Sequence, residues 1–120
     1  MNQAVRTPEG RLIDPKEVTI ALPGRKLVYL GDSYDASSML PLAENADLLV
    51  HEATFLAEKV SESAAREKHH STAAMAGRFA KEAKVQCLFL NHFSGGAMDR
   101  SARDTVLAVQ REAFEAMGGD

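Results

Sequence analysis

The sequence predicts an α/β domain with a largely parallel or mixed sheet. Three short apolar runs, residues 26–30, 47–50 and 85–90, alternate with segments of helical periodicity. This alternation is typical of strands that are joined by crossover helices. Short apolar runs bounded by turn residues also fit strands that are buried on both faces of a sheet.

Composition limits the class of protein. The chain has 120 residues, 45% of them hydrophobic and 26% charged, which suffices for one domain over residues 1–120 and not for two. No apolar run is long enough to span a membrane, and the first ten residues lack the core of a signal peptide. A single Cys suits a reducing, cytoplasmic location. The net charge of −3 argues against a free-standing nucleic-acid-binding domain.

The first third of the chain contains two predicted strands. Residues 1–16 carry prolines and a glycine and predict a polar lead-in around a turn. Residues 18–22 are rich in β-branched side chains and predict a short strand that stops at Pro23. Residues 26–30 predict the first core strand, with Asp32 just past its carboxyl end.

The second core strand follows a short helix. Ser37 and Ser38 are candidate caps for this helix, which ends near Asn45. The apolar run at 47–50 then leads directly into Glu52, so a second titratable side chain is expected at the carboxyl edge of the sheet.

Two helices are predicted before the third strand. Residues 57–68 are charged and alanine-rich, which predicts a mostly solvated helix. Ser71 is a good N-cap for a helix that runs to about Ala83. Its apolar residues share one face at helical spacing: Met75, Ala76, Phe79, Ala80 and Ala83.

The third strand, residues 85–90, stops immediately before Asn91 and His92. A last helix over residues 99–117 ends at Gly118. The expected buried face of this helix comprises Ala102, Val106, Val109, Ala113 and Met117.

Asp32, Glu52 and His92 therefore follow the three predicted core strands, and His70 precedes a helix. In open α/β sheets, ligands bind at this carboxyl edge. Carboxylate and imidazole ligands suit zinc or a related divalent metal. A glutamate beside a histidine can also form a pair that moves a proton.

Each residue also has an ordinary structural interpretation. Asp32 in Gly-Asp-Ser can form a simple turn, and Glu52 can be a solvated charge at a strand end. His69 is most simply a surface histidine. His51 is turned to the opposite face of the strand from Glu52 by the alternation of side chains.

The motifs occur in a characteristic order. They are Gly31-Asp32-Ser33, His51-Glu52-Ala53-Thr54, His70-Ser71-Thr72 and Asn91-His92-Phe93-Ser94. This order is similar to the C-terminal half of tRNase Z, the transfer RNA 3′-processing endonuclease of the metallo-β-lactamase superfamily. The resemblance covers residues 24–94. It implies half of an αββα sandwich, a mixed sheet with helices on one face, and an apolar sheet face left uncovered.

The resemblance also implies roles for four residues. Asp32 matches the aspartate that bridges two zinc ions, and His92 matches the last histidine ligand. Glu52 and His70 match the pair proposed to protonate the leaving 3′ oxygen. The implied activity is a zinc-dependent endoribonuclease that removes the 3′ trailer of precursor tRNA, using two metals to clamp the reacting oxygens.

Three departures from the family pattern matter. Ser33 replaces a threonine, residues 95–98 replace an Arg-Tyr pair, and the first-half His-x-His-x-Asp-His cluster is absent together with a further histidine. The matched positions supply only Asp32 and His92, whereas each zinc needs about four ligands. We therefore expect the isolated chain to be inactive and its site to be completed by the N-terminal half or by a homodimer partner.

Two other functions stay open at this point. The first is a phosphodiesterase of the same superfamily that acts on a small phosphodiester such as a cyclic nucleotide. The second is a non-catalytic pairing module whose site residues are relics. The ligand types also suit manganese or iron.

Overall fold

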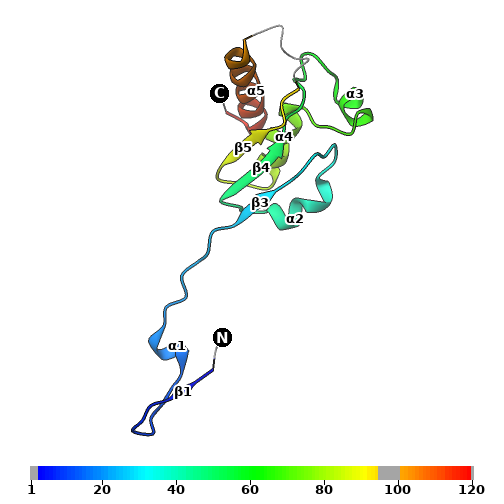
Figure 1. Ribbon diagram of the computed structural model, residues 1–120. Coiled ribbons are helices and arrows are strands. Elements are labelled where there is room, and N and C mark those ends of the chain that lie inside the picture. Colours follow the sequence, from blue (N-terminus) through cyan, green and yellow to red (C-terminus); the bar gives the residue numbers. More distant parts are fainter. Residues whose placement is uncertain (1–2, 95–100, 120) are drawn as a thin grey trace.

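The fold centres on a three-stranded parallel sheet. The computed structural model describes residues 3–94 and 101–119. Strands β3 (Leu27–Tyr29), β4 (Leu48–Glu52) and β5 (Leu88–Asn91) lie in the order β3-β4-β5, and both ladders are parallel (Figure 1). The α/β prediction is therefore confirmed. Within the described residues this sheet is parallel rather than mixed.

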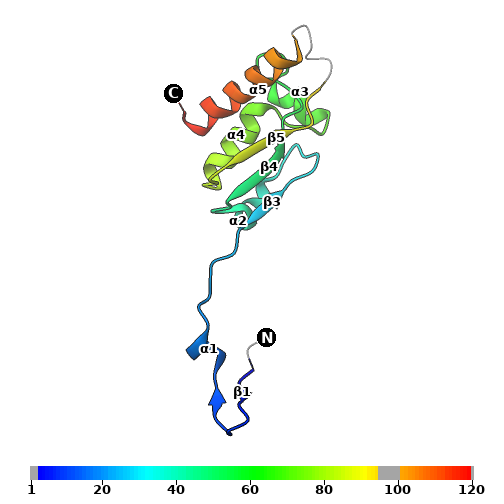
Figure 2. The ribbon, with the colours of Figure 1, turned by 60° about the vertical axis from the view of Figure 1, so that its left-hand side comes forward.

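Helices connect these strands and follow the last one. They are η1 (Ser37–Met39), α2 (Leu40–Ala43), α3 (Glu62–Glu67), α4 (Ala73–Glu82) and α5 (Ala102–Met117). Helices α4 and α5 pack side by side on the same face of the sheet (Figure 2). The expectation of helices on one face is confirmed. In the part of the chain that the structure describes, no helix is long and apolar enough to cross a membrane.

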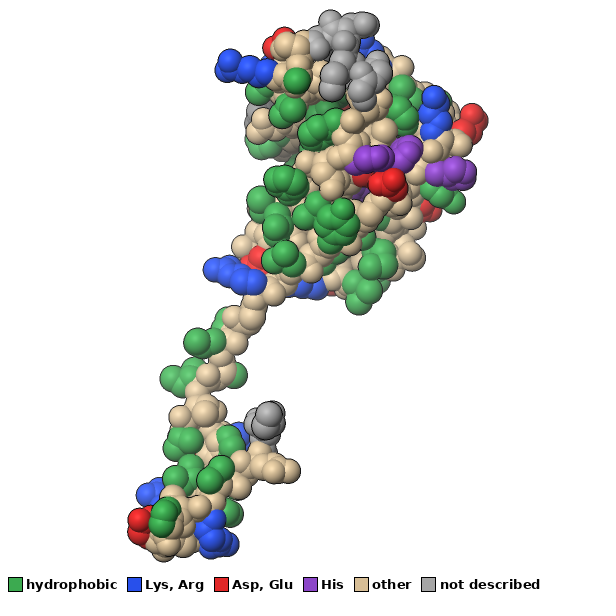
Figure 3. Space-filling view, in the orientation of Figure 1, with side chains coloured by type: hydrophobic (Ala, Val, Ile, Leu, Met, Phe, Trp, Pro, Cys, Tyr) green, Lys and Arg blue, Asp and Glu red, His purple; other side chains and the backbone are tan. Residues whose placement is uncertain are grey.

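The two faces of the sheet differ in burial. Val28, Leu49 and Leu88 are register neighbours and pack beneath the helices. The opposite face carries Leu27, Leu48, Tyr29, Val50 and Phe89 in register. Leu27 and Tyr29 are each 69% exposed and Phe89 is 60% exposed, and Figure 3 shows apolar side chains over the strands. Burial on both faces is therefore wrong for the described residues, whereas the uncovered apolar face agrees with the resemblance.

Two predicted helix caps are wrong. The Ser37 N–H donates to the Asp35 carboxylate (3.0 Å), so Asp35, rather than either serine, binds the first turn of η1. The N-cap of α4 is Thr72, whose hydroxyl accepts the Met75 N–H at 3.2 Å, rather than Ser71. The Ser71 hydroxyl instead donates to the carbonyl of Ser33, a neighbour far along the chain.

Predicted boundaries also shift. Helix α3 is shorter than the predicted 57–68 because Ser61 caps it one residue before Glu62. On α5, Val109 and Ala113 are buried as predicted, but Ala102 and Val106 are exposed. The substitutions at residues 95–98 and the start of the predicted last helix lie outside the described residues.

The N-terminal segment forms a hairpin away from the sheet (Figure 1). Strands β1 (Val5–Arg6) and β2 (Leu12–Ile13) are antiparallel, and Gly10 takes a φ of 88° in the turn that joins them. Helix α1 (Pro15–Val18) follows, with Asp14 as its cap. The predicted strand at 18–22 is wrong, because residues 19–22 lie outside any ladder and are exposed.

Close approach of α4 and α5 depends on Gly77. A Cβ at this position would lie against the carbonyl oxygen of Ala113 and 2.9 Å from the Cβ of Ala116. Neither neighbour can move without displacing α5. Glycine is therefore required by the helix packing rather than by backbone conformation.

We expect Gly77→Ala to lower the free energy of unfolding by about 1–3 kcal/mol, because the added methyl group overpacks the contact between the two helices. Chemical denaturation followed by circular dichroism measures this change. Gly24→Ala is the matched control, since nothing lies within 4 Å of its added Cβ. Equal stabilities of the two variants would contradict this account of the packing.

Candidate active site

The four residues singled out from the sequence meet at one end of the sheet. Asp32, Glu52, His70 and His92 each offer a metal-ligand type of atom, and these atoms lie within 4.8 Å of one another. Glu52 ends β4, Asp32 lies in the loop after β3, and His92 directly follows β5. The histidines gather beside a carboxylate next to the apolar sheet face (Figure 3). Parallel strands produce this meeting because their carboxyl ends share one edge.

Glu52 is the buried anchor of the cluster, with 1% of its surface exposed. Its Oε1 accepts the Ser33 N–H (2.7 Å) and His70 Nδ1 (3.0 Å). Its Oε2 accepts the Ser71 N–H (3.1 Å) and the Thr54 hydroxyl (2.5 Å). A carboxylate offers about four acceptor positions, so all of them are used. Glu52 is thus built to hold its neighbours rather than to bind a metal.

These contacts keep Glu52 ionised. Burial by itself raises the pKa of Glu52, but the hydrogen bonds from Thr54, Ser71, Ser33 and His70 outweigh it and hold the pKa below its ordinary value. An ionised carboxylate only accepts hydrogen bonds, so the Nδ1 of His70 carries the proton that they share. The Nε2 of His70 is then the nitrogen left for exchange with another group.

Asp32 and His92 form the open side of the cluster. His92 Nδ1 lies 3.4 Å from Asp32 Oδ1, and the two side chains are 47% and 61% exposed, respectively. The φ of His92 is 57°, in the left-handed region, and the Ser94 N–H donates to the Thr54 carbonyl (3.0 Å) close by. Both side chains therefore present ligand atoms that a metal ion can reach from solvent.

Thr54 links the two halves of the cluster and has no role in the sequence prediction. Its hydroxyl donates to Glu52, so its oxygen accepts a hydrogen bond from the Nδ1–H of His92, 3.0 Å away. The lone pair of His92 then lies on Nε2, the nitrogen that can bind a metal. Strand alternation is the signal that could have identified Thr54, because it stands two residues after Glu52.

We expect Thr54→Val to remove the hydrogen bond that fixes the His92 ring, because valine keeps the shape of threonine but has no oxygen to accept it. Divalent-metal affinity should fall by roughly 10–100-fold, the usual effect of losing an outer hydrogen bond to a ligand. ¹⁵N NMR of the ring should show both neutral tautomers instead of one. Thr54→Ser retains the hydroxyl and should behave as the unaltered chain; an unchanged His92 tautomer in Thr54→Val would refute the link.

Ser33 and Ser71 position the loops around Glu52. The Ser71 hydroxyl donates to the Ser33 carbonyl, in addition to the bonds that both N–H groups give to Glu52. The sequence interpretation assigned Ser71 to capping the following helix. The contacts with Glu52 and Ser71 are made by the N–H and the carbonyl of Ser33. Because serine and threonine share these backbone groups, the replacement of threonine leaves both contacts intact.

The two remaining histidines lie outside the cluster, as the sequence interpretation has it. His69 is exposed and contacts Tyr34, with 5.3 Å between the ring centroids. His51 is buried on the other face of β4, with its ring 5.7 Å from that of Phe79. Burial lowers the pKa of His51, against the opposing effects of the Glu52 carbonyl and carboxylate.

Comparisons with known proteins identify the relatives of this arrangement. No protein-family profile matches the chain. Ribonuclease Z of Natronomonas pharaonis is 40% identical over an alignment of 119 residues, which covers 98% of this chain and 36% of that protein. Ribonuclease Z of Brevibacillus brevis is 42% identical, covering 95% of this chain and 36% of its own length.

Solved structures agree with these relatives. The metallo-β-lactamase fold protein YhfI from Bacillus subtilis superposes with a TM-score of 0.60 and 34% identity, over 79% of this chain and 35% of that one. Human tRNase Z, short form, gives a TM-score of 0.54 and 36% identity, over 71% and 30%. The resemblance to tRNase Z is confirmed, and the fold is that of part of a metallo-β-lactamase domain. The chain spans about a third of the length of the proteins it matches.

Proposed function

We propose that this chain supplies one part of the active site of a zinc-dependent endoribonuclease that removes the 3′ trailer of precursor tRNA. The observation that carries the proposal is the division of the cluster. Glu52 is saturated and holds His70, whereas Asp32 and His92 keep exposed ligand atoms. Similarity to ribonuclease Z over 98% of the chain supports the RNA substrate.

Asp32 and His92 are the residues that would hold metal. Carboxylate oxygen with imidazole nitrogen suits zinc, and Asp32 has two oxygens with which to bridge a pair of ions. Bound metal would polarise the phosphate and supply an attacking hydroxide at neutral pH. Thr54 fixes the His92 ring for this role through its bond to Nδ1.

His70, held by Glu52, would donate a proton to the leaving 3′ oxygen. The Glu52 carboxylate accepts a hydrogen bond from Nδ1 of His70 at 3.0 Å and so fixes the orientation of the ring. His70 then gives its Nε2 proton to the 3′ oxygen as the bond from that oxygen to phosphorus breaks, and the neutral ring regains a proton from water. The tRNA leaves with a 3′ hydroxyl and the trailer with a 5′ phosphate.

Residues beyond these 120 would complete the site. Two ligand residues are half of what even a single four-coordinate zinc needs. The apolar face formed by Leu27, Tyr29, Val50 and their neighbours is the surface on which the remaining part of the domain would pack. That part can belong to a longer polypeptide or to a partner chain, including a second copy. We call the resulting assembly the completed domain. Its proposed location is the cytoplasm, because the exposed, unpaired thiol of Cys87 suits a reducing compartment.

Precursor tRNA and bis-p-nitrophenyl phosphate distinguish the candidate functions when the completed domain is assayed on both. The proposal expects zinc-dependent cleavage of the precursor immediately 5′ to its trailer. Hydrolysis of the small ester alone would identify an enzyme for small phosphodiesters. Inactivity on both substrates, with zinc bound, would indicate a non-catalytic module.

A further inference from the structure

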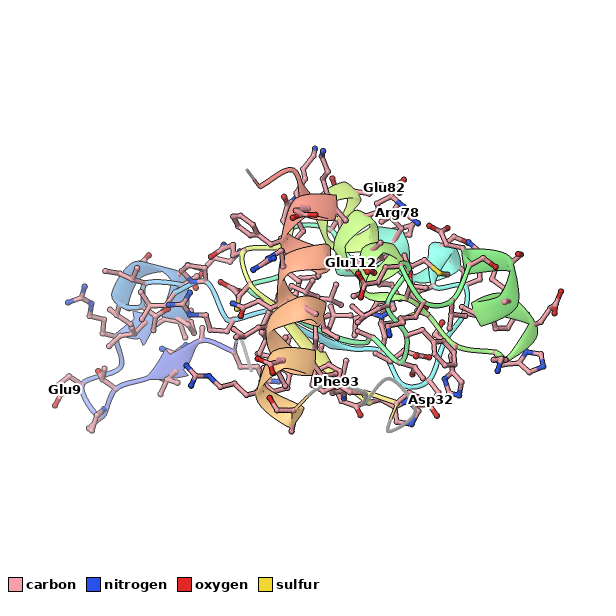
Figure 4. All side chains as sticks on the ribbon, turned by 90° about the horizontal axis from the view of Figure 1, so that it is seen from above. Glu9, Asp32, Arg78, Glu82, Phe93 and Glu112 are labelled. Atoms are coloured by element: carbon pink, nitrogen blue, oxygen red, sulfur yellow. The ribbon has the colours of Figure 1, made fainter. Side chains whose placement is uncertain are left out.

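Glu112 joins three elements of the fold at a distance from the metal-ligand cluster. It lies on the side of α5 that faces α4, away from Asp32 (Figure 4). Its Oε1 accepts the N–H groups of Ala57 (3.0 Å) and Ala74 (2.8 Å), and its Oε2 also accepts the Ala57 N–H (2.9 Å). Glu112 therefore connects α5 to the segment after β4 and to the first turn of α4.

The start of a helix explains the contact with α4. The first N–H groups of a helix have no partner inside it. In α4 the Thr72 hydroxyl accepts the Met75 N–H, and Glu112 accepts the N–H of Ala74. A carboxylate at this end also interacts favourably with the helix dipole. Glu112 thus stabilises the first turn of α4 from a different helix.

Glu112 fastens the same two segments that Glu52 fastens at the site. Glu52 accepts hydrogen bonds from Thr54 on one segment and from Ser71 on the other. Glu112 accepts them from the residues three positions further along each segment. Between these points a parallel backbone bridge pairs the segments. The pair of segments is therefore held by one carboxylate at the site and by a second carboxylate at the helices.

His70 depends on this fastening more than Thr54 does. Thr54 lies two residues after β4, and the N–H of Ala53 between them donates to the Asn91 carbonyl (2.9 Å), so the sheet itself fixes this segment. His70 lies between α3 and α4, outside the strands. The place where α4 begins therefore decides where the His70 ring lies relative to Glu52.

We propose that Glu112 is a positioning residue for His70. By holding the first turn of α4 against the segment after β4, it keeps Nδ1 of His70 within hydrogen-bonding distance of Glu52, and this contact aims Nε2 at the leaving oxygen. Metal binding by Asp32 and His92 does not depend on it. The effect on cleavage rests on the proposed function, whereas the effect on the His70 ring does not.

Glu112→Ala in the completed domain tests the effect on cleavage. The loss of its hydrogen bonds should lower kcat/KM on precursor tRNA about tenfold, because a displaced acid delivers its proton less efficiently. A precursor with sulfur in place of the leaving 3′ oxygen needs no proton from His70, so its cleavage should change less than about twofold. Equal losses on the two substrates would show a merely structural role and overturn the proposal.

Two further variants control for charge and for folding. Glu115→Ala removes an exposed carboxylate from the same helix and should leave both rates unchanged. Glu112→Gln keeps an oxygen in the place of Oε1, which accepts from both segments, and should retain most of the cleavage. Loss of cleavage in Glu115→Ala equal to that in Glu112→Ala would contradict the assignment.

¹⁵N NMR of the full chain tests the effect on the His70 ring without any cleavage. The neutral ring should carry its proton on Nδ1 in the unaltered chain and should show both tautomers in Glu112→Ala. Glu112→Asp is one methylene too short to reach both segments, so it should show both tautomers too and replaces the alanine variant if that variant fails to fold. A single tautomer in these variants would overturn the proposal.

The two measurements separate this inference from the proposed function. A His70 ring that responds to Glu112, in a completed domain that leaves the precursor intact, would refute the endoribonuclease and keep the positioning role. Cleavage of the precursor with no response of the ring, and with equal losses on the two substrates, would refute only the role of Glu112.

Discussion

Asp32→Ala should abolish cleavage of precursor tRNA by the completed domain. Asp32 is the carboxylate on the open side of the cluster, 3.4 Å from His92, and the residue matched to a bridging ligand. Losing an outer partner of a ligand costs roughly 10–100-fold, so losing the ligand itself should cost more than about 100-fold in metal affinity and in kcat/KM. Zinc titration and single-turnover cleavage measure the two quantities.

The matched control is His69→Ala. His69 is an exposed histidine next to His70, but its ring contacts Tyr34 and lies outside the cluster. Its removal should leave metal affinity and cleavage within a few tenths of a logarithmic unit of the unaltered protein. Full cleavage by Asp32→Ala, or a comparable loss in His69→Ala, would show that the metal ligands are assigned wrongly.

Glu52→Ala should produce the largest loss of stability in the chain. The substitution leaves two backbone N–H groups, the Thr54 hydroxyl and His70 without their acceptor. The free energy of unfolding should fall by about 3–5 kcal/mol, as when one partner of a buried charged network is removed. Urea denaturation at neutral pH measures it, and Glu67→Ala, at an exposed position, should change it by less than about 0.5 kcal/mol.

The pH dependence gives a second, independent readout. The pKa of Glu52 is held below its ordinary value of 4.5, mainly because its hydrogen bonds outweigh burial. The stabilisation by its carboxylate is therefore complete above about pH 4.5 and is lost as the pH falls through the folded-state value. The difference in the free energy of unfolding between the unaltered chain and Glu52→Ala should therefore become smaller as the pH falls. A constant gap would contradict the role given to the ionised carboxylate.

The meeting of Asp32, Glu52 and His92 was predictable because strand ends are local features of a sequence. Short apolar runs end directly before the residues that meet, and parallel pairing of β3, β4 and β5 brings those ends together. Thr54 escaped prediction because its role needs two partners, Glu52 and His92, which lie 2 and 38 residues away. Alternation could place Thr54 on the side of Glu52, two residues earlier, but nothing local in the sequence indicates its contact with His92.

The errors arose where tertiary contacts decide between equal local choices. Ser71 and Thr72 are both suitable N-caps for α4. The Ser71 hydroxyl donates to the Ser33 carbonyl, so Thr72 caps the helix. Residues 18–22 have strand propensity, but a strand also needs a ladder, and Asp14 with Pro15 starts a helix just before them. Exposure of Tyr29 and Phe89 was implied only by the resemblance, since apolar runs by themselves predict burial.

The division of labour in the cluster is tested most directly by a precursor tRNA whose leaving 3′ oxygen is replaced by sulfur. A thiolate leaves without a proton because a thiol has a pKa of about 8.5, far below that of an alcohol. The account predicts that His70→Ala, in the completed domain, cleaves this substrate nearly as fast as the unaltered protein while failing on the oxygen substrate, and that Asp32→Ala fails on both. Equal impairment of His70→Ala on the two substrates would contradict it.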